Sequence, residues 1–327
     1  ITLSGAKGVA AFNWFFLTKR ANVVALTSTF SCLATFVLSL GLLDRTGSDS
    51  FSWLPISDIF SVDLGFVLDP LSSRMMLVVT GIGLLVHVFS LAYMADDKAK
   101  TRYFACLSLF MFSMTGIVLA SNIAMTFIFW ELVGLSSYLL IGHDPRRRAN
   151  RGAAQTALIV TTSGGLAMLV GIVAVWQASG TLSLEQIAAN PPVGALATAG
   201  ALLMLVGALT KSALVPFHFW LPGAMAAPTP ISAYLHAAAM VKAGVYLVAV
   251  LAPSFATVPF WRPTIMLLGT ATLIVGGWRA LRQTDLKLLL AYGTVSQLGL
   301  MTLVIGTGNP DALLGGLAML IAHATFK

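Results

Sequence analysis

Charged residues are scarce in this chain. Asp, Glu, Lys and Arg make up only 9% of its 327 residues, whereas 57% are hydrophobic. Ordinary soluble domains contain about 25% charged and about 45–50% apolar residues. The mean hydropathy of +0.89 agrees with this contrast. The composition therefore excludes a typical soluble enzyme or binding domain and indicates a protein that lies almost wholly in a lipid bilayer.

Cysteine is almost absent as well. Cys32 and Cys106 both lie in apolar stretches, so we expect neither a disulfide framework nor a metal cluster. No two His or Cys residues have the spacing of metal ligands, and no nucleotide, flavin or iron–sulfur motif is present. We therefore expect no metal, no cofactor and no catalytic chemistry in the chain, and any redox reaction belongs to partner subunits.

A secretory signal peptide is not recognisable, because no cleavage site follows a short apolar core. Residues 1–18 are apolar, but they are too few to cross a bilayer and they begin without methionine. The last apolar stretch stops at Lys327 without a polar tail. We expect both ends to be cuts through a longer polypeptide.

What the sequence has instead is a series of long apolar stretches. A helix needs about 20 residues to cross about 30 Å of hydrocarbon. Ten stretches meet or approach this length, and they predict an all-α, polytopic integral membrane helix bundle. They cover approximately residues 21–43, 71–94, 103–121, 122–142, 152–176, 194–222, 229–251, 263–281, 286–306 and 311–327.

Basic residues are distributed unevenly over the loops. If the stretches cross the membrane in alternating directions, thirteen Lys and Arg residues fall on one side and only Arg45 and Arg262 on the other. Loops rich in Lys and Arg stay in the cytoplasm, so we predict a multi-pass protein of the cell (inner) membrane. The net charge of +7 then indicates contact with the membrane surface and not with nucleic acid. The predicted cytoplasmic segments lie near 1–20, 95–102, 143–151 and 279–287.

Two connections are longer than the rest. Segment 44–70 alternates roughly over residues 56–68, which predicts a small external β-hairpin. Segment 177–193 contains Leu182–Gln186, which predicts a short surface helix. Neither connection is long enough for a soluble catalytic domain.

Three charged residues interrupt the apolar stretches: Glu131, Lys211 and Lys242. Such a charge at mid-bilayer costs about 2.5–3.5 kcal/mol, so the three represent roughly 7–10 kcal/mol. Residues of this kind usually mark a route for protons or ions. An ion pair between Glu131 and Lys211 would keep both charged, and its separation would release a proton because burial disfavours an unpaired ammonium. The structural alternative is a fixed pair that locks helices, or lysines that snorkel to the interface.

A helix break is expected in the stretch 194–222. Pro216 removes one backbone hydrogen bond and clashes with the carbonyl of Ser212. Transport proteins use such breaks because freed backbone groups at mid-membrane hold water or ions. A kink that serves only packing is the alternative, but Lys211 and His218 beside the break favour a functional role.

Histidines extend this polar series. His236 lies six residues before Lys242, so in a regular helix the two do not share a face and would be joined through water. His323 and Lys327 are four residues apart and do share a face, which indicates a further polar step. For His218, His236 and His323 the alternative is a packed, hydrogen-bonded core histidine.

Four motifs together resemble a known family, the antiporter-like proton-translocating superfamily. It includes the large membrane subunits of respiratory complex I and of Mrp-type multisubunit Na+/H+ antiporters. The motifs are Phe129–Tyr138, Lys211–His218, Ala227–His236 and Asp285–Tyr292.

Different parts of the chain resemble different branches of this superfamily. Residues up to about 142, with Leu68–Ser72 and Glu131–Gly134, are similar to subunit L of complex I (NADH-quinone oxidoreductase). From His143 onward the chain is more similar to the A-type subunit of Mrp antiporters. Met240–Tyr246 carries that comparison, because the complex I subunit commonly has threonine where Lys242 stands.

The resemblance implies a fold of about fourteen helices with two inverted five-helix repeats around broken helices. Residues 1–100 would hold the N-terminal transmembrane helices and the external loop 44–70. Residues 101–251 would form the first repeat, and 263–327 the start of a truncated second repeat.

The resemblance also implies a role for each polar residue. Glu131 would gate, Lys211 would carry the proton on the broken helix, and Lys242 with His236 would relay it. His323 and Lys327 would lead toward a second half-channel.

The function that we favour on these grounds is a proton-translocating membrane subunit of an Mrp-type cation/proton antiporter. Its expected partners are other membrane subunits, protons, Na+ and lipid. Two alternatives stay open. In the first, the chain belongs to a proton-pumping subunit of complex I, which is a translocase. In the second, it is a structural subunit that conducts nothing.

Overall fold

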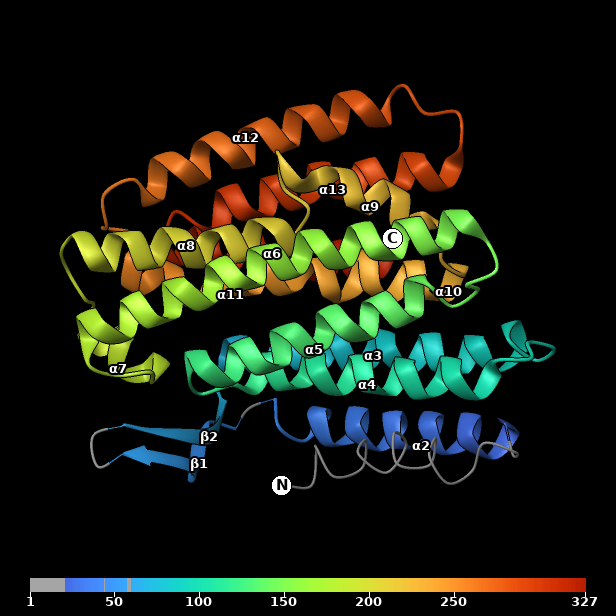
Figure 1. The fold of residues 1–327 in the computed structure, drawn as a ribbon, viewed down its shortest axis with the longest axis horizontal. Helices are drawn as coiled ribbons and strands as arrows, with labels where there is room; N and C mark the ends of the chain where they lie inside the picture. The colour runs from blue at the N-terminus through green and yellow to red at the C-terminus, as the bar shows by residue number, and fades with distance from the viewer. Residues whose placement is uncertain (1–20, 44, 58–59) are drawn as a thin grey trace.

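Long helices that run side by side make up most of the chain (Figure 1). This computed structural model describes residues 21–43, 45–57 and 60–327. The apolar N-terminal stretch 1–18 lies outside the described residues. Ten long helices are described: α2 (Ala21–Leu40), α3 (Pro70–Tyr93), α4 (Lys100–Leu119), α5 (Ile123–Ile141), α6 (Arg148–Ser179), α8 (Ala195–Lys211), α11 (Met240–Phe255), α12 (Trp261–Ala280), α13 (Leu286–Ile305) and α14 (Pro310–Phe326).

Short helices lie between the long ones. One group follows α8 and leads into α11, and a single short helix precedes α8. These elements are α7 (Leu184–Ala189), η1 (Phe217–Phe219), α9 (Trp220–Gly223), η2 (Ala224–Ala226), α10 (Thr229–Ile231) and the π-helix η3 (Ser232–Ala238). The surface helix predicted at 182–186 is α7, shifted by two residues at its start.

Each of the ten predicted apolar stretches contains a helix, which confirms a polytopic helical protein. Seven helices in the described part are long and apolar enough to cross a membrane, with Thr229–Phe255 counted as one. Two apolar helices, Ala195–Lys211 and Pro310–Phe326, are shorter. Helix α12 has 20 residues but is not among the seven, and it carries Arg262 and Arg279 near its ends.

Polar residues at the ends of the apolar stretches set where several helices begin. Asp69 caps α3, because its carboxylate accepts from the Ser72 amide at 2.6 Å while the Ser72 hydroxyl accepts from the Asp69 amide at 2.8 Å. Asn122 caps α5 with a single bond, in which its side-chain oxygen accepts from the Met125 amide at 2.7 Å. Such caps satisfy amides that a helix leaves unbonded at its start.

The external loop forms a larger hairpin than predicted. Strands β1 (Gly47–Ser57) and β2 (Phe60–Leu68) pair antiparallel, with Gly47 opposite Leu68. The expected hairpin within 56–68 was wrong in extent, and the fold is not purely α. Strand β1 has no clear apolar alternation and is interrupted by irregular pairing, so only its partner strand reveals it. The Ser121 amide donates to the Gly65 carbonyl and ties the hairpin to the α4–α5 loop.

The loops are sorted between the two ends of the bundle. The α3–α4, α5–α6 and α12–α13 loops gather at one end, whereas the hairpin and α7 lie at the other (Figure 1). The first end is the one on which the basic loop residues fall. The arrangement therefore agrees with the predicted alternation, and the cytoplasmic location of the basic end stays a prediction.

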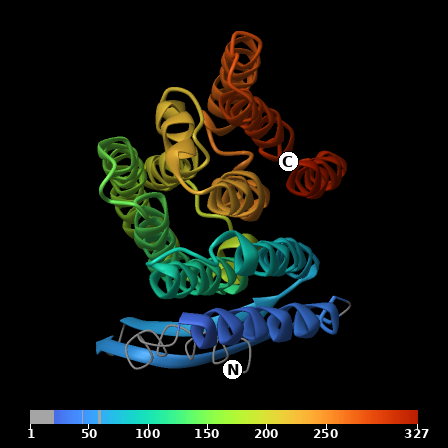
Figure 2. The same ribbon diagram turned by 90° about the vertical axis from the view of Figure 1, so that its right-hand side faces the viewer.

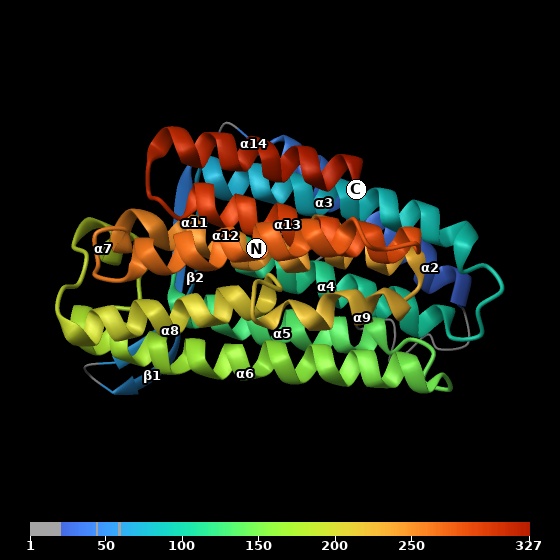
Figure 3. The ribbon, with the colours of Figure 1, turned by 90° about the horizontal axis from the view of Figure 1, so that it is seen from above.

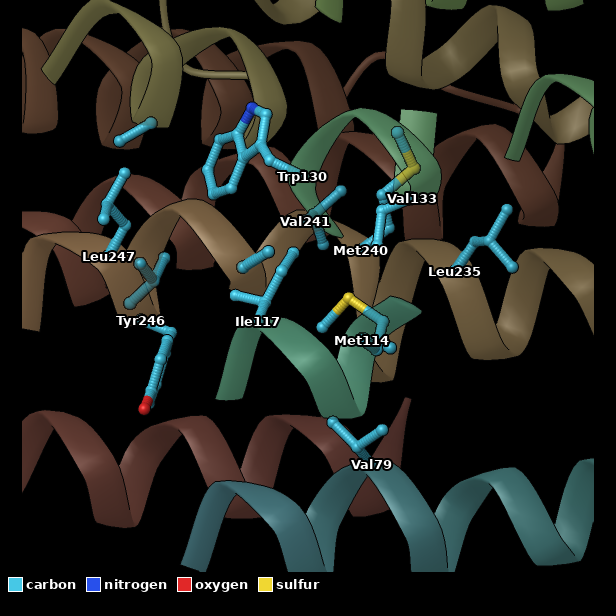
Figure 4. Close-up of a cluster of buried hydrophobic side chains, with 14 of the residues drawn as sticks. Val79, Met114, Ile117, Trp130, Val133, Leu235, Met240, Val241, Tyr246 and Leu247 are labelled. Atoms are coloured by element: carbon cyan, nitrogen blue, oxygen red, sulfur yellow. The ribbon is translucent and has the colours of Figure 1, made fainter. Parts of the chain in front are cut away.

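Helix α11 lies at the centre of the bundle. The view along the bundle shows α2 and the hairpin as an outer layer, with α12 and α13 on the opposite side and α14 beside α11 (Figure 2). Buried apolar side chains of α3, α4, α5, η3 and α11 meet around α11, among them Val79, Met114, Trp130, Leu235 and Tyr246 (Figure 4). Lys211 and Lys242 are buried within this bundle, whereas Glu131 is half-buried.

Candidate functional site

Two lysines are completely buried in the centre of the bundle. Lys211 and Lys242 each have a relative exposure of 0%. A lysine that snorkels keeps its ammonium in water or among lipid headgroups, and these side chains do neither. The snorkelling alternative is therefore excluded for both residues. Burying a charge is unfavourable unless it is paired or solvated, so the surroundings of each ammonium decide what it does.

Lys211 is held by α5. Its Nζ donates to the Trp130 carbonyl at 2.9 Å and lies 4.9 Å from the centroid of the Trp130 ring. A Cβ at Gly134, one turn further along α5, would lie 3.5 Å from the same nitrogen. A carbonyl oxygen and an aromatic face both stabilise a cation. One of the three donors of the ammonium is thereby satisfied.

Glu131 follows Trp130 in sequence, but its side chain faces α6. A Cβ at Gly165 would come within 1.9 Å of the Glu131 Oε1 atom, and Thr162 also interacts with the carboxyl group. The described residues contain no Glu131–Lys211 ion pair within 4.0 Å. The expected direct pair is therefore wrong in this structure. The two groups act on each other through space, while a carbonyl holds the ammonium and α6 accommodates the carboxylate.

Two consecutive glycines of α6 make this arrangement possible. Gly165 leaves room for Glu131 of α5, and Gly164 leaves room for Thr210 of α8, whose Oγ1 would lie 1.8 Å from a Cβ there. Sequence reasoning missed these residues. The only indication was a Gly-Gly pair inside an apolar helix, where glycine costs stability unless something approaches closely.

The predicted break in the 194–222 stretch is confirmed, although it begins before Pro216. Helix α8 ends at Lys211, and Ala213 follows with a left-handed φ of 51°. The Val215–Pro216 bond is cis. In Figure 1, α9 and α10 both lie beyond the end of α8, toward the same end of the bundle. Helix α8 thus ends directly before Ser212, the residue whose carbonyl the ring of Pro216 would meet in a continuing helix.

Polar groups freed at the break have partners on neighbouring helices. The Val215 amide donates to the Thr272 hydroxyl of α12 at 2.9 Å, and the Trp220 indole donates to the Thr210 carbonyl at 3.0 Å. The Ser212 hydroxyl donates to the Val241 carbonyl at 2.7 Å. Backbone groups at membrane depth need such partners. Because Ser212 adjoins Lys211 and Val241 adjoins Lys242, this last bond also joins the two segments that carry the buried lysines.

His236 lies in the π-helix η3, and a distorted residue separates it from Lys242. Ala239 between them has φ −127° and ψ −75°. The prediction that His236 and Lys242 lie on different helix faces assumed a regular helix. The chain between them is not a regular helix. Both ring nitrogens of His236 and the Nζ of Lys242 are buried without a hydrogen-bond partner in the described chain.

His323 joins this region from α14. It is 0% exposed, the Ala237 backbone acts on it, and neither ring nitrogen makes a hydrogen bond of ordinary geometry among the described residues. The charges of Lys242 and Lys327 both act on it. Lys327 lies against α13, since a Cβ at Gly293 would be 3.0 Å from its Nζ. The structure therefore brings Lys242, His323 and Lys327 into one electrostatic neighbourhood.

His218 stands apart from these groups. It lies in η1 beyond the break and is half-buried, and the side-chain charge that acts on it is that of Arg279. Lys287, which sequence reasoning treated as a loop residue, is more closely connected. Its Nζ donates to the carbonyls of Met225 and Ala227 at 2.7 and 2.8 Å, and its charge acts on His236.

No group of three or more His, Cys, Asp or Glu side chains in the described ranges is arranged to hold a metal ion. The ionisable side chains of this site are the amines of Lys211 and Lys242, the imidazoles of His236 and His323 and the half-buried carboxyl of Glu131, all of which exchange protons. The fold and these side chains define a multi-pass membrane protein with titratable groups enclosed in its core.

Comparison with known proteins narrows this class to a family. Residues 120–327 match the family described as NADH:quinone oxidoreductase/Mrp antiporter, TM. Residues 53–104 match the N-terminus of chain 5 of NADH-ubiquinone oxidoreductase (complex I). The chain belongs to this antiporter-like family, which confirms the resemblance that the motifs carry.

Relatives from both branches match nearly the whole chain. It is 41% identical over 317 residues to NAD(P)H-quinone oxidoreductase subunit 5 of Zygnema circumcarinatum chloroplasts, covering 93% of this chain and 45% of that protein. It is 38% identical to the A/B subunit of a probable K(+)/H(+) antiporter of Rhizobium meliloti, covering 96% of this chain and 32% of that protein. The chain thus spans less than half the length of these relatives.

The structure also resembles an experimentally solved one. The Mrp complex from Dietzia sp. DQ12-45-1b contains a chain that superposes with a TM-score of 0.91 at 34% identity. The superposition covers 99% of this chain and 36% of that one. The division at residue 142 into parts similar to different branches stays a prediction, as do the two inverted repeats.

Proposed function

We propose that this chain forms the proton-conducting part of a larger membrane subunit, in which protons move along Glu131, Lys211, Lys242, His236 and His323. The observation that carries the proposal is the burial of Lys242, whose ammonium has no hydrogen-bond partner among the described residues at 0% exposure. An inert anchor gains nothing from such a residue, because an unpaired charge in this position is strongly unfavourable. A group that alternately gains and loses a proton needs a setting of this kind.

The surroundings of Lys211 suit it to the first transfer. Its ammonium holds one fixed bond to the Trp130 carbonyl, so two of its N–H groups are free to donate elsewhere. The carboxylate of Glu131 acts on it without contact, and an approach by that carboxylate would favour the protonated amine. Retreat would disfavour it, so the amine would give its proton to water and keep the electron pair.

The next steps lead along α11 toward α14. The bond between Ser212 and Val241 places the backbone of Lys211 beside that of Lys242. The buried nitrogens of His236 and Lys242 need water if they are to be hydrogen-bonded. A proton released by Lys211 would pass through such water to Lys242 and on to His323. Lys327 would continue this path, and His218 would serve the aqueous side of the break.

For the parent assembly we favour an Mrp-type antiporter, in which proton movement would be coupled to Na+ moving the other way. Lys242 favours this branch, and the likeness to the Dietzia Mrp complex supports it. The partners would then be the other membrane subunits of such a complex. A specific observation also supports the second candidate, a proton-pumping subunit of a quinone oxidoreductase, because a chloroplast subunit 5 is 41% identical.

The test replaces Lys211 with alanine in the full-length protein within its assembled complex. Proton flux is followed in everted vesicles with and without a Na+ gradient. The proposal expects loss of flux with assembly intact, and dependence on Na+ indicates the antiporter branch. Co-purification with quinone reductase activity and no Na+ dependence indicates the other branch.

A structural subunit predicts a different result. Replacing Glu131 and Lys211 together with apolar residues of similar size, Glu131→Leu and Lys211→Met, should then leave both assembly and transport of the parent complex unchanged. That outcome would refute the proposal, since no carboxyl or amine would remain to take part.

A further inference from the structure

A polar cavity opens where several loops meet at the end of the bundle that carries the basic residues. It has a volume of about 550 Å³ and is lined from the end of α3, the α3–α4 loop, the α5–α6 loop, the η2–α10 junction and the start of α13. His143 and Asp97 both line it, with His143 Nε2 and Asp97 Oδ2 3.1 Å apart. Neither residue belongs to the relay described above.

His143 is buried deeply for a loop residue. Its relative exposure is 5%, whereas that of the Asp97 side chain is 33%. The Tyr103 ring packs edge-on against the imidazole at 5.5 Å, and the Arg102 guanidinium donates to the His143 carbonyl. Asp97 is fixed as well, because its other oxygen accepts from the Ala99 amide at 2.6 Å. The pair is therefore held in one geometry with one partner open to water.

The inner wall of the cavity leads toward the buried relay. Ala227 is part of that wall and accepts from the Lys287 ammonium at 2.8 Å. Lys287 lines the same cavity, and its charge acts on His236. The hydroxyl of Ser232, at the start of η3, donates to the Ala227 carbonyl at 3.4 Å. The cavity and His236 are thus separated by one short stretch of chain.

We propose that this cavity is the mouth through which the chain exchanges protons with water on that side, and that the Asp97–His143 pair collects them. The proposal rests on the proton-conducting function proposed above. The imidazole takes a proton from cavity water while Asp97 holds the resulting cation, and it returns the proton to water nearer Lys287. The bond broken is O–H of a protonated water and the bond formed is N–H, so no other reactant is needed.

Other ionisable groups line the same cavity or contact His143 and set the electrostatic surroundings of the pair. They are Tyr93, Asp96, Arg102, Tyr103, Asp144, Arg147 and Lys287.

The test measures initial proton flux of the full-length protein in its complex at low and at high concentrations of a diffusible buffer. His143→Gln keeps a polar side chain of similar length but cannot take up a proton, so flux should fall by about 10²-fold at low buffer. Added imidazole should restore it, because a mobile base replaces the fixed one. Asp97→Asn keeps the acceptor for the Ala99 amide and should lower flux in the same direction.

A matched control is Asp311→Asn, which removes an exposed carboxylate at the start of α14, at the opposite end of the bundle (Figure 3). Its flux should equal that of the wild type. Unchanged flux in His143→Gln at low buffer would overturn the inference, as would a loss that imidazole does not relieve, since the pair would then only join two loops. Lys211→Ala in the same vesicles separates the two proposals. If it abolishes flux while His143→Gln conducts normally, only the proposed mouth fails.

Discussion

Replacing Gly165 with alanine displaces the Glu131 carboxylate without changing any charge. The new Cβ would stand 1.9 Å from the Glu131 Oε1 atom, whereas ordinary contacts begin at 3.4 Å. The carboxylate must therefore move by about 1.5 Å, which its side-chain rotations allow at a cost of about 0.5–1.5 kcal/mol. Alanine gains about 0.8–1.0 kcal/mol over glycine inside a helix. The net change in the free energy of unfolding should stay within about 1 kcal/mol.

Proton flux should respond much more strongly. In catalysis, a misplacement of about 1 Å costs about 10²-fold in rate, and a transfer that depends on the place of one carboxylate is subject to the same geometry. We expect Gly165→Ala to lower flux by about one to two orders of magnitude. Flux is measured in everted vesicles, and the melting temperature of the purified complex is measured in parallel.

Two further variants make the test specific. Gly152→Ala, on the same helix, is the matched control, because a Cβ at Gly152 has nothing within 4 Å. Glu131→Asp in the Gly165→Ala background shortens the carboxylate side chain by one methylene and should recover part of the flux. The reasoning is refuted if Gly165→Ala conducts like the wild type, or if its loss of flux follows a loss of folded complex.

Three other substitutions probe the contacts that fix the site. Gly244→Ala would bring a Cβ within 2.3 Å of the Ala208 backbone carbonyl, which cannot rotate away, so α8 and α11 should separate at a cost of about 3 kcal/mol or more, seen as a lower melting temperature. Lys287→Met removes a donor from the part-buried carbonyls of Met225 and Ala227. Ser232 still donates to Ala227, so the complex should be destabilised by about 1 kcal/mol in the same measurement. Tyr246→Phe removes the 2.8 Å bond from the phenol to the Val118 carbonyl and should cost about 1 kcal/mol, with flux retained. A stability equal to wild type in any of the three would contradict the contact concerned.

Most of the helical architecture follows from composition and length alone. An apolar stretch of about twenty residues has few stable forms in lipid other than a helix, so every predicted stretch contains one. Local polar residues such as Asp69 and Asn122 also mark the starts of helices. The hairpin shows the limit of this reasoning. Strand β1 exists because its backbone pairs with β2, and no property of residues 47–57 alone requires it.

The candidate site is less predictable, because its contacts join distant parts of the chain. The buried positions of Lys211 and Lys242 follow from their place in apolar stretches. That Lys211 bonds to a carbonyl of α5 and not to Glu131 depends on how α5, α6 and α8 pack. The same holds for Gly165, whose importance appears only when the opposing side chain is known. The roles of the individual relay residues and the side of the membrane on which each end lies stay predictions.

The interruption after α8 has a mechanical consequence. Its polar groups are secured to α11, to α12 and to Trp220 of α9 by bonds of 2.7–3.0 Å, so it acts as a rigid elbow and not as a hinge. Movement next to the interruption is then limited to long side chains and solvent, which reorient in picoseconds to nanoseconds. Helix displacements take microseconds or longer. Charge transfer past this elbow would accordingly need no displacement of the end of α8 from α11 and α12.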